Sequence, residues 1–421
     1  MNINHLSRNI KIRLFTSFYT RIVSVSIMPF MALFFADHLG RVFAGTFLLI
    51  SALISFTSKL WGGYVADRNK RKTILIISTI TGTFLMVLMT ICLLDINNYI
   101  FIFAFIYLIW NVVSSIGSPA LNALILDSTT KENRKRVYVI SYWLDNIAIS
   151  VGIAMGGIMY KSHRLELFIL LSCALFVTSI IYVLFLQDNH VPLLNKLRAN
   201  PFLDAISNYS VAIKDQNYLK YVIGLIFFFS AEFSVANYIG IRLKDTFQTI
   251  DILGFQIDGI KMMSAITIEN TIVVVAFTFI ITSLVELMPK QKAYLLGILI
   301  YGVGYAALNV ANSVYGILIF GLFAVIGELI CVPIHMEEQA KLVPDDRRAS
   351  YLAFGSLSFS GGDMLGRFGI ILGAYLIAPT MAIYTGIAVA IGAFLIYSSF
   401  YIGKSIKAAS VSLNEDIEIA E

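Results

Sequence analysis

Long apolar runs separated by short polar segments make up almost the whole chain. The run at 73–94 (TILIISTITGTFLMVLMTICLL) contains no charged residue. Runs of this kind exceed the roughly 18–20 residues that a helix needs to cross a bilayer. The pattern predicts an all-α membrane protein with twelve membrane-spanning helices, at 12–36, 42–66, 73–94, 98–126, 138–160, 164–187, 219–243, 262–287, 293–312, 314–338, 350–377 and 381–402.

The composition excludes a soluble protein. Hydrophobic residues make up 58% of the chain and charged residues only 14%, whereas about a quarter of a soluble domain is charged. The basic N-terminus is followed by a long apolar stretch without a small-residue cleavage site, so it predicts a first spanning helix and not a removable signal. Cys92, Cys173 and Cys331 are scattered within apolar runs, so we expect no disulfide and no metal site.

The positive charges of the loops predict the orientation. Most of the 31 lysines and arginines fall in alternate loops, on the side that also holds the N-terminus. Six of them, Arg242 included, are assigned to the loops of the opposite side. By the positive-inside rule this side faces the cytoplasm. We therefore expect a multi-pass protein of the cell membrane with both termini in the cytoplasm. The net charge of +5 is explained in this way without nucleic acid as a partner.

The longest polar connection, 188–218, separates six predicted helices from six. We expect an N-terminal half (1–187), a cytoplasmic linker (188–218), a C-terminal half (219–403) and a cytoplasmic tail (404–421). KENRKRVYVISYW after the fourth helix is echoed by PDDRRASYLAFGS after the tenth. Such parallel halves are typical of transporters with a substrate site near the midplane. At 244–261 we favour an ordinary ordered loop over a hairpin that caps the outer mouth.

Two motifs indicate how the helices pack and move. The loop GGYVADRNKRK (62–72) resembles the major facilitator signature G-x-x-x-D-R-x-G-R-K at Gly63, Asp67, Arg68, Arg71 and Lys72, with Lys70 in place of a glycine. We expect Gly63 to allow close helix approach, and the resemblance implies that the loop braces the cytoplasmic gate. The segment VGIAMGG (151–157) resembles an exporter motif at Gly152, Gly156 and Gly157, but Ile153 replaces its proline, and such spacing also serves plain helix packing.

Five acids and three bases lie inside predicted helices: Asp145, Glu232, Glu269, Glu328, Asp363, Arg21, Lys59 and Arg367. A charge within a bilayer costs ~2.5–3.5 kcal/mol on insertion scales, so each is a functional candidate. Asp363 and Arg367 are four residues apart and predict a structural ion pair. Lys59 can extend to water at its helix end. Arg21 either pairs with a buried acid or binds an anionic substrate. We expect Glu269 to line the substrate cavity and not an external vestibule.

Glu328 interrupts the apolar stretch FAVIGELICVPIH (323–335). It lies far from the nearest polar loop, so we favour a functional role in proton coupling and substrate binding. His335 is seven residues further on and shares its helix face. For His335 we favour a capped histidine at the membrane interface over a proton relay. We expect the shared face to point into a central cavity.

These motifs and charges resemble the multidrug/proton antiporters of the major facilitator superfamily, among them one from lactococci. The resemblance covers most of the chain, and its best stretches are ADRNKRK, ALILDSTTKENRK, YWLDN, GFQIDGIKM and IGELICVP. It implies the major facilitator fold, with two pseudo-symmetric halves of six helices. It also implies that Asp67, Asp127 and Glu328, which match acids of the family, couple protons to export.

Two acids of the family pattern are missing, at Ser141 and Ala236. Asp145 and Glu232 lie four residues from these positions and therefore on the same helix faces. We predict that they replace the lost carboxylates in proton coupling and substrate binding. Lys261 keeps the charge of a family arginine but not its fork geometry. These departures affect drug specificity more than proton coupling.

Together these features predict a transporter, not an enzyme: a proton-coupled exporter of amphipathic, cationic small molecules that works by alternating access. We expect a monomer whose partners are the substrate, protons and membrane lipid. No cofactor is expected, because the proton gradient supplies the energy and the sequence has no G-x-x-x-x-G-K-[ST] nucleotide loop. The predicted substrate-binding residues are Glu328, Asp145, Glu232, Glu269 and Arg21. The alternative is a dedicated exporter of one metabolite, such as an anionic siderophore, or of a lipid, using Arg21, Lys59 and Arg367.

Overall fold

Helices account for nearly all of the regular structure. The computed structural model describes residues 7–129, 131–187, 212–252, 254–344 and 348–402. Within this part of the chain, nine stretches are long and apolar enough to cross a bilayer, and one of them, Arg71–Leu124, holds two consecutive helices. Each predicted span coincides with a helix or a run of short helices. The prediction of an all-α, multi-pass membrane protein is confirmed.

The contacts divide the chain into two compact units. The first holds Met1–Asp204 and Thr249–Thr271, and the second holds Ala205–Gln248 and Ile272–Glu421. Helix α11 (Gly259–Glu286) contributes residues to both units. The predicted division into halves with a linker at 188–218 stays a prediction. Most of that linker and the predicted tail lie outside the described residues.

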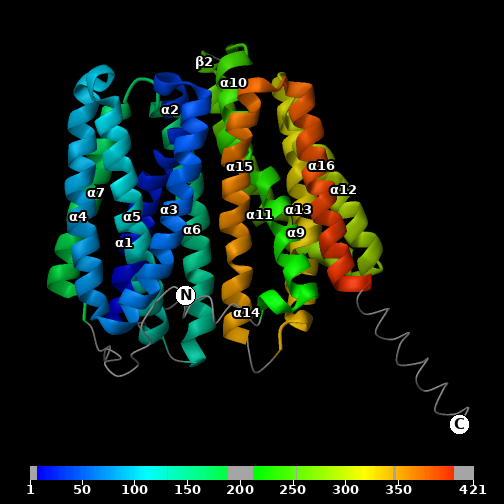
Figure 1. Ribbon diagram of the computed structural model, residues 1–421, viewed down its shortest axis with the longest axis horizontal. Helices are drawn as coiled ribbons and strands as arrows, with labels where there is room; N and C mark the ends of the chain where they lie inside the picture. The colour runs from blue at the N-terminus through cyan, green and yellow to red at the C-terminus, as the bar shows by residue number, and fades with distance from the viewer. Residues whose placement is uncertain (1–6, 130, 188–211, 253, 345–347, 403–421) are drawn as a thin grey trace, which may run out of the picture. The chain divides into compact units, whose positions relative to one another are not determined.

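The first unit is built mainly from long helices. Its elements are α1 (Arg8–Val25), η2 (Met28–Phe30), α2 (Met31–Leu39), α3 (Arg41–Arg68), α4 (Arg71–Cys92), η3 (Leu93–Asp95), α5 (Ile96–Ser128), α6 (Lys131–Met159), α7 (Arg164–Phe185), β1 (Ile250–Ile252), β2 (Phe255–Ile257) and the first half of α11. Helix α4 packs against both α5 and α7, and the three lie side by side in Figure 1. Helix α1 packs against α6.

The first predicted span is interrupted instead of continuous. Helix α1 ends at Val25, and the short 3-10 helix η2 separates it from α2. Pro29 lies in the first turn of η2, and because proline lacks an N–H, it ends the hydrogen-bond ladder of α1. Phe30, Phe34 and Phe35 are fully buried directly after this break. The apolar pattern alone therefore predicted the length of the span but not its break.

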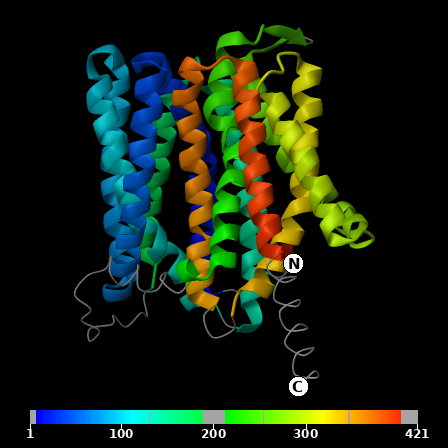
Figure 2. The ribbon, with the colours of Figure 1, turned by 45° about the vertical axis from the view of Figure 1, so that its right-hand side comes forward.

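The second unit contains the remaining helices. They are α9 (Gln216–Phe233), the π-helix η4 (Val235–Ile239), α10 (Gly240–Thr246), the second half of α11, α12 (Lys290–Leu308), α13 (Val314–Leu342), α14 (Arg348–Gly355), α15 (Leu357–Tyr375), α16 (Ala378–Tyr397) and the π-helix η6 (Ser398–Ile402). Helix α9 packs between α15 and α16, as Figure 2 shows for the green, orange and red ribbons. Helices α12 and α13 form a second closely packed pair.

Glycines allow the closest helix contacts of the second unit. A Cβ atom on Gly327 of α13 would lie 2.3 Å from the Tyr301 backbone nitrogen of α12. On α15, a Cβ atom on Gly362 or Gly366 would lie 2.6 or 2.7 Å from a phenylalanine Cβ of α9. Small residues at four-residue spacing commonly let membrane helices approach in this way. Both contacts hold helices that carry candidate site residues.

Two features at the helix ends differ from the sequence predictions. Strands β1 and β2 pair antiparallel, with Asp251 opposite Gln256, so the expectation of an ordinary loop is wrong. The turn between the strands depends on Gly254, which has a φ of 80° that side chains rarely adopt. Arg242 was expected in an external loop. It is only 5% exposed, and its guanidinium donates to the carbonyl oxygens of Leu308 and Ala311 at the end of α12.

Candidate functional site

Two carboxyl groups lie near each other inside the second unit. Glu232 of α9 and Glu328 of α13 are both half-buried, and their carboxyl groups lie close enough to interact electrostatically. The hydroxyl groups of Tyr301 and Tyr305 on α12 interact electrostatically with both carboxyl groups. Two carboxylates at such a site repel each other when both are ionised. A proton or a cation bound at the pair relieves this repulsion.

Packing around α12 fixes this carboxyl pair in place. The Tyr301 hydroxyl donates to the backbone oxygen of Phe228 at 2.8 Å, and the two rings stack with centroids 4.1 Å apart. Gly327, directly before Glu328, touches the backbone of α12. The tyrosine ring therefore joins α12 to α9, and the glycine joins α12 to α13. The helices that carry the two carboxyl groups are thus both anchored on α12.

His335 lies elsewhere than expected. It is 5% exposed and surrounded by aromatic rings, with ring centroids at 5.1 Å for Phe228, 5.6 Å for Tyr294 and 6.2 Å for Phe400. The prediction of a histidine capped at the membrane interface is wrong, because α9, α12 and η6 cover it. Within the described residues, its Nε2 atom has no hydrogen-bond partner.

The first unit contains a polar cavity of about 500 Å³. Helix α1 presents one polar face to it, with Arg13, Ser17, Thr20, Arg21 and Ser24 at the spacing of successive helical turns. Helices α4, α5, α6 and α7 complete the lining, with Ser78, Thr79, Ser114, Ser118, Asp145, Thr178, Trp110 and Tyr182 among its residues. The volume lies within the range of about 300–1,000 Å³ that is typical of small-molecule sites.

Arg21 and Asp145 are the charged residues of interest in this cavity. Both line it and both side chains are exposed to it. Among the residues that the structure describes, neither has a hydrogen bond or an ion pair, and they do not pair with each other. Of the two readings left open for Arg21, pairing with a buried acid is therefore not observed. The chain thus presents the cation of Arg21 and the anion of Asp145 to the same cavity, which Arg13 also lines.

The other predicted charges are placed separately. Glu269 lies in the part of α11 that belongs to the first unit, and its Oε2 atom is buried without a hydrogen-bond partner in the described structure. Lys59 is exposed on α3 and does not line the cavity. Asp363 and Arg367 form an ion pair on α15, with 2.9 Å between Oδ2 and Nε. The predicted substrate residues are thus divided between units, with Glu328 and Glu232 in the second.

The loop motif between α3 and α4 braces neighbouring helices. The guanidinium of Arg68 stacks on the ring of Tyr64 at 3.6 Å, and the Lys72 ammonium donates to the Val183 oxygen in the last turn of α7 at 3.0 Å. A cation at that position satisfies a carbonyl group that the helix leaves free. Arg71 is buried at the start of α4. The side chains of Asp67 and Asp127, predicted to couple protons, lie outside the described residues.

The close approach expected at Gly63 is found one residue earlier. A Cβ atom on Gly62 would lie 2.5 Å from the Ile116 backbone oxygen of α5, whereas one on Gly63 meets nothing within 4 Å. The expectation for Gly63 is wrong because the motif fixes the loop, while the rotation of α3 decides which glycine faces α5. Its predicted role in gating stays a prediction.

The three glycines of the second motif contact three different elements. Gly152 and Gly156 of α6 face α1 and η2, where an added Cβ would lie 2.4 Å from the Ile22 oxygen and 2.3 Å from the Phe30 ring. Gly157 instead faces α11, where an added Cβ would lie 2.3 Å from Ser264 Oγ. The motif thus packs α6 tightly on both sides.

Beside Gly157, an ion pair joins the end of α6 to the start of α11. Lys161 Nζ lies 2.6 Å from Asp258 Oδ2, and Asp258 Oδ1 accepts from the backbone N–H of Lys261 at 3.0 Å. Burial alone would raise the pKa of Asp258. The hydrogen bonds from Lys161 and the Lys261 N–H, with the charges of both lysines, outweigh that effect and lower the pKa below its usual value.

We predict that Asp258→Asn lowers the thermal stability of the purified protein at pH 7 by a small amount, under about 1 kcal/mol for an exposed pair. A carboxyl group with a lowered pKa stabilises the folded state above its usual pKa of about 3.9, and this contribution is lost as the pH falls through the lowered value. The difference between variant and wild type should therefore disappear towards pH 3. Lys161→Met is the matched control and should add no loss in the double variant. An equal difference at both pH values would contradict the assignment.

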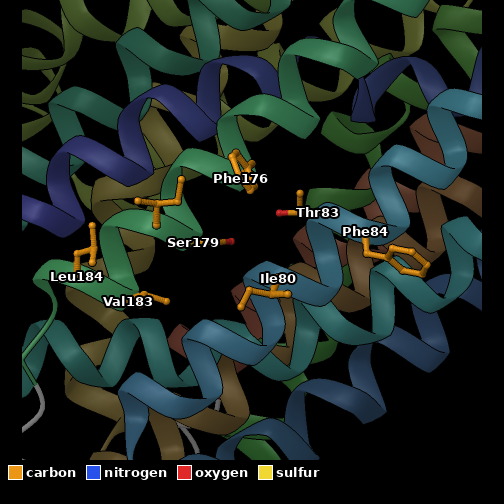
Figure 3. A pocket seen from close by; sticks show the side chains of 8 residues that line it. Ile80, Thr83, Phe84, Phe176, Ser179, Val183 and Leu184 are labelled. Carbon is orange, nitrogen blue, oxygen red and sulfur yellow. The ribbon is translucent and has the colours of Figure 1, made fainter.

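An apolar groove lies on a neighbouring face of the α4–α7 pair (Figure 3). Phe84, Phe176 and Leu184 are exposed along it, and the hydroxyl groups of Thr83 and Ser179 point into the space between the helices. Its lining exposes only apolar surface. In a membrane protein such a face contacts lipid tails, so we do not include the groove in the candidate site.

Several residues of these sites were missed in the sequence. The hydroxyl-bearing residues of the first cavity carry no charge, but their spacing along α1 is a signal that could have been found. Tyr301 and Tyr305 could not be distinguished from ordinary packing aromatics, because their importance depends on which helices meet. Asp258 was read only as part of a loop, since its partner Lys161 is distant in sequence.

The fold and the charged groups within the spans define a multi-pass membrane transporter. Residues 13–268 match the family profile of the Major Facilitator Superfamily, and the chain belongs to this superfamily. The predicted family and the predicted fold class are thereby confirmed, and so is the prediction that the protein is not an enzyme.

Curated relatives span nearly the whole chain. A Na(+), Li(+), K(+)/H(+) antiporter of Planococcus maritimus is 25% identical over 391 residues, which are 89% of this chain and 92% of the relative. The uncharacterized MFS-type transporter YqjV of Bacillus subtilis (strain 168) is 22% identical, over 83% of this chain and 82% of its own length.

Solved structures share the fold at low sequence identity. A POT family transporter in complex with 5-aminolevulinic acid has a TM-score of 0.73 at 13% identity, and covers 94% of this chain and 97% of its own. A bacterial homologue of the iron transporter ferroportin in the inward-facing state has a TM-score of 0.69 at 13% identity, with 94% and 99% covered. At this identity the likeness supports the fold alone.

Proposed function

We propose that the chain is a proton-coupled antiporter that exports amphipathic, cationic small molecules. In this proposal it lies in the cell membrane as a monomer, with both termini in the cytoplasm. The observation that carries the proposal is the Glu232–Glu328 carboxyl pair inside the spanning helices of the second unit. A buried acidic pair of this kind costs free energy that ordinary packing does not require.

The pair supports exchange because its two ligands compete. Protons reach the pair when it is open to the outside, and neutralise the repulsion between the carboxylates. When the transporter opens to the cytoplasm, the protons leave and a cation takes their place. Since protons and substrate bind to the same carboxyl groups, binding of one releases the other.

The remaining predicted roles belong to this proposal. Asp67, Asp127 and Asp145 are proposed to couple protons with the pair, and Glu269 to contact the substrate. The loop residues Gly63, Asp67, Arg68, Arg71 and Lys72 and the motif residues Gly152, Gly156 and Gly157 are proposed to act in gating. The contacts of Lys72 with α7 and of Gly157 with α11 support gating because they brace helix ends.

Alkali cation/proton exchange is a second candidate. The relative described as a Na(+), Li(+), K(+)/H(+) antiporter favours it, because the likeness extends over 89% of this chain. Carboxylate oxygens also bind small hard cations. The two candidates share the carboxyl pair and differ in the size and apolar character of the cation.

Everted membrane vesicles with an acidic interior distinguish the candidates. Under the proposed function, ethidium or Hoechst 33342 should accumulate in the vesicles and release protons, and collapse of the pH gradient should stop both processes. Addition of NaCl or KCl should release protons only if alkali cations are substrates. Vesicles without the protein are the control. No proton release with any of these cations would contradict both candidates.

A further inference from the structure

Two side chains of opposite charge line the polar cavity of the first unit. Arg21 reaches it from α1 and Asp145 from α6, and both side chains are exposed to its space. Within the described residues, neither group makes a hydrogen bond or an ion pair. Each charge in a spanning helix costs ~2.5–3.5 kcal/mol on insertion scales. Two such groups kept apart in one cavity therefore indicate a ligand that supplies both partners.

A structural ion pair of this chain offers a direct contrast. Asp363 and Arg367 are four residues apart on α15 and meet at 2.9 Å. The two charges of that pair neutralise each other and leave little charge for a ligand to bind. Arg21 and Asp145 come from two helices and leave both charges available. The difference in geometry separates a packing role from a binding role.

The hydroxyl groups of the cavity restrict what else the ligand can be. Thr20, Thr79 and Thr178 each donate to a backbone oxygen of their own helix, at 2.6, 2.7 and 2.8 Å. The remaining capacity of Thr20 and Thr79 for a ligand is that of an acceptor, whereas Thr178 already accepts from the Tyr19 hydroxyl at 2.6 Å. The oxygens of Thr20 and Thr79 suit the N–H groups of an ammonium beside Asp145. An anionic group is attracted by the guanidinium groups, of which Arg21 is the exposed one, and hydroxyl groups of the lining such as that of Ser17 can donate to it.

We propose that this cavity is a subsite for zwitterionic substrates, in which Arg21 binds the anionic group and Asp145 binds the ammonium. The proposal rests on the proposed export function and adds to its cationic substrates compounds that carry both charges. The cavity volume of about 500 Å³ accommodates a drug-sized molecule. Trp110 and Tyr182 in the lining provide apolar surface for its body.

The test compares norfloxacin, which carries a piperazinyl ammonium and a carboxylate, with its methyl ester, which carries only the ammonium. Binding to the purified full-length protein in lipid nanodiscs is measured by titration calorimetry. Wild type should bind norfloxacin more tightly than the ester. Arg21→Gln should weaken norfloxacin binding by about tenfold or more, the effect of a lost charge-assisted hydrogen bond, and leave the ester unchanged. Asp145→Asn should weaken both ligands.

Two variants control for folding and for general charge effects. Arg21→Lys keeps the charge and should restore part of the preference for norfloxacin. Lys292→Gln removes an exposed cation at the start of α12, outside the cavity, and should change neither affinity. The subsite is overturned if wild type binds both ligands equally or if Arg21→Gln weakens both equally. Failure of ethidium-driven proton release in vesicles would instead overturn the proposed function, and leaves this binding result standing.

Discussion

Replacing Glu328 with glutamine should abolish proton-driven export while the protein remains folded. Glutamine has the same shape but carries no charge, so the repulsion with Glu232 and the attraction for protons and cations both vanish. We expect the initial rate of proton-coupled ethidium transport in everted vesicles to fall by more than about tenfold, as for the loss of a charge-assisted contact. The measurement is proton release and dye accumulation at matched protein levels.

Two further variants make this result specific. Glu232→Gln should give the same loss, and the double variant should be no worse, because the two carboxyl groups act as one unit. Glu286→Gln is the matched control: it removes an exposed acid at the end of α11 and should leave transport intact. Unchanged transport in Glu328→Gln would remove the carboxyl pair from the mechanism.

Replacing Gly327 with valine should prevent stable folding of the second unit. An added Cβ would lie 2.3 Å from the Tyr301 nitrogen and 2.6 Å from the Gly297 oxygen. Both atoms belong to the backbone of α12 and cannot rotate away. Overpacking of this kind costs about 1–3 kcal/mol or more. We expect a low yield from membranes and a clear loss of thermal stability in detergent.

A second glycine separates crowding from helix propensity. Gly386 of α16 has nothing within 4 Å of an added Cβ. Gly386→Val is therefore the same glycine-to-valine substitution without the clash. Thermal unfolding of this control should stay close to that of wild type. Equal stability of the two variants would show that α12 and α13 do not depend on their contact at Gly327.

The spans and their charged residues could be predicted because the bilayer imposes simple rules on a local pattern. The length of an apolar run identifies a spanning helix. An acid inside such a helix, such as Glu232 or Glu328, costs free energy in the bilayer and is therefore a functional candidate. Glu232 could be identified because it lies four residues from a family acid position, at Ala236, and therefore on the same helix face. The local pattern could not say that Tyr301 interacts with both acids, because that depends on which helices meet.

The errors have the same origin. Arg242 looked like a loop charge because its partners are the carbonyl groups of Leu308 and Ala311, far along the chain. His335 looked interfacial because only its own helix could be considered. The loop motif indicated Gly63, whereas the rotation of α3 placed Gly62 against α5. In each case a tertiary neighbour decided the environment.

The π-helix η4, which begins three residues after Glu232, has a consequence for how this transporter can change over evolution. A π turn holds one residue more than an α turn, and one residue corresponds to about 100° of helix rotation. Deletion of a single residue from 235–239 would let α9 run into α10 as an unbroken α-helix. Glu232 would then turn away relative to Arg242, which is tied to the end of α12. The acid can therefore be re-aimed by a one-codon insertion or deletion, without any substitution.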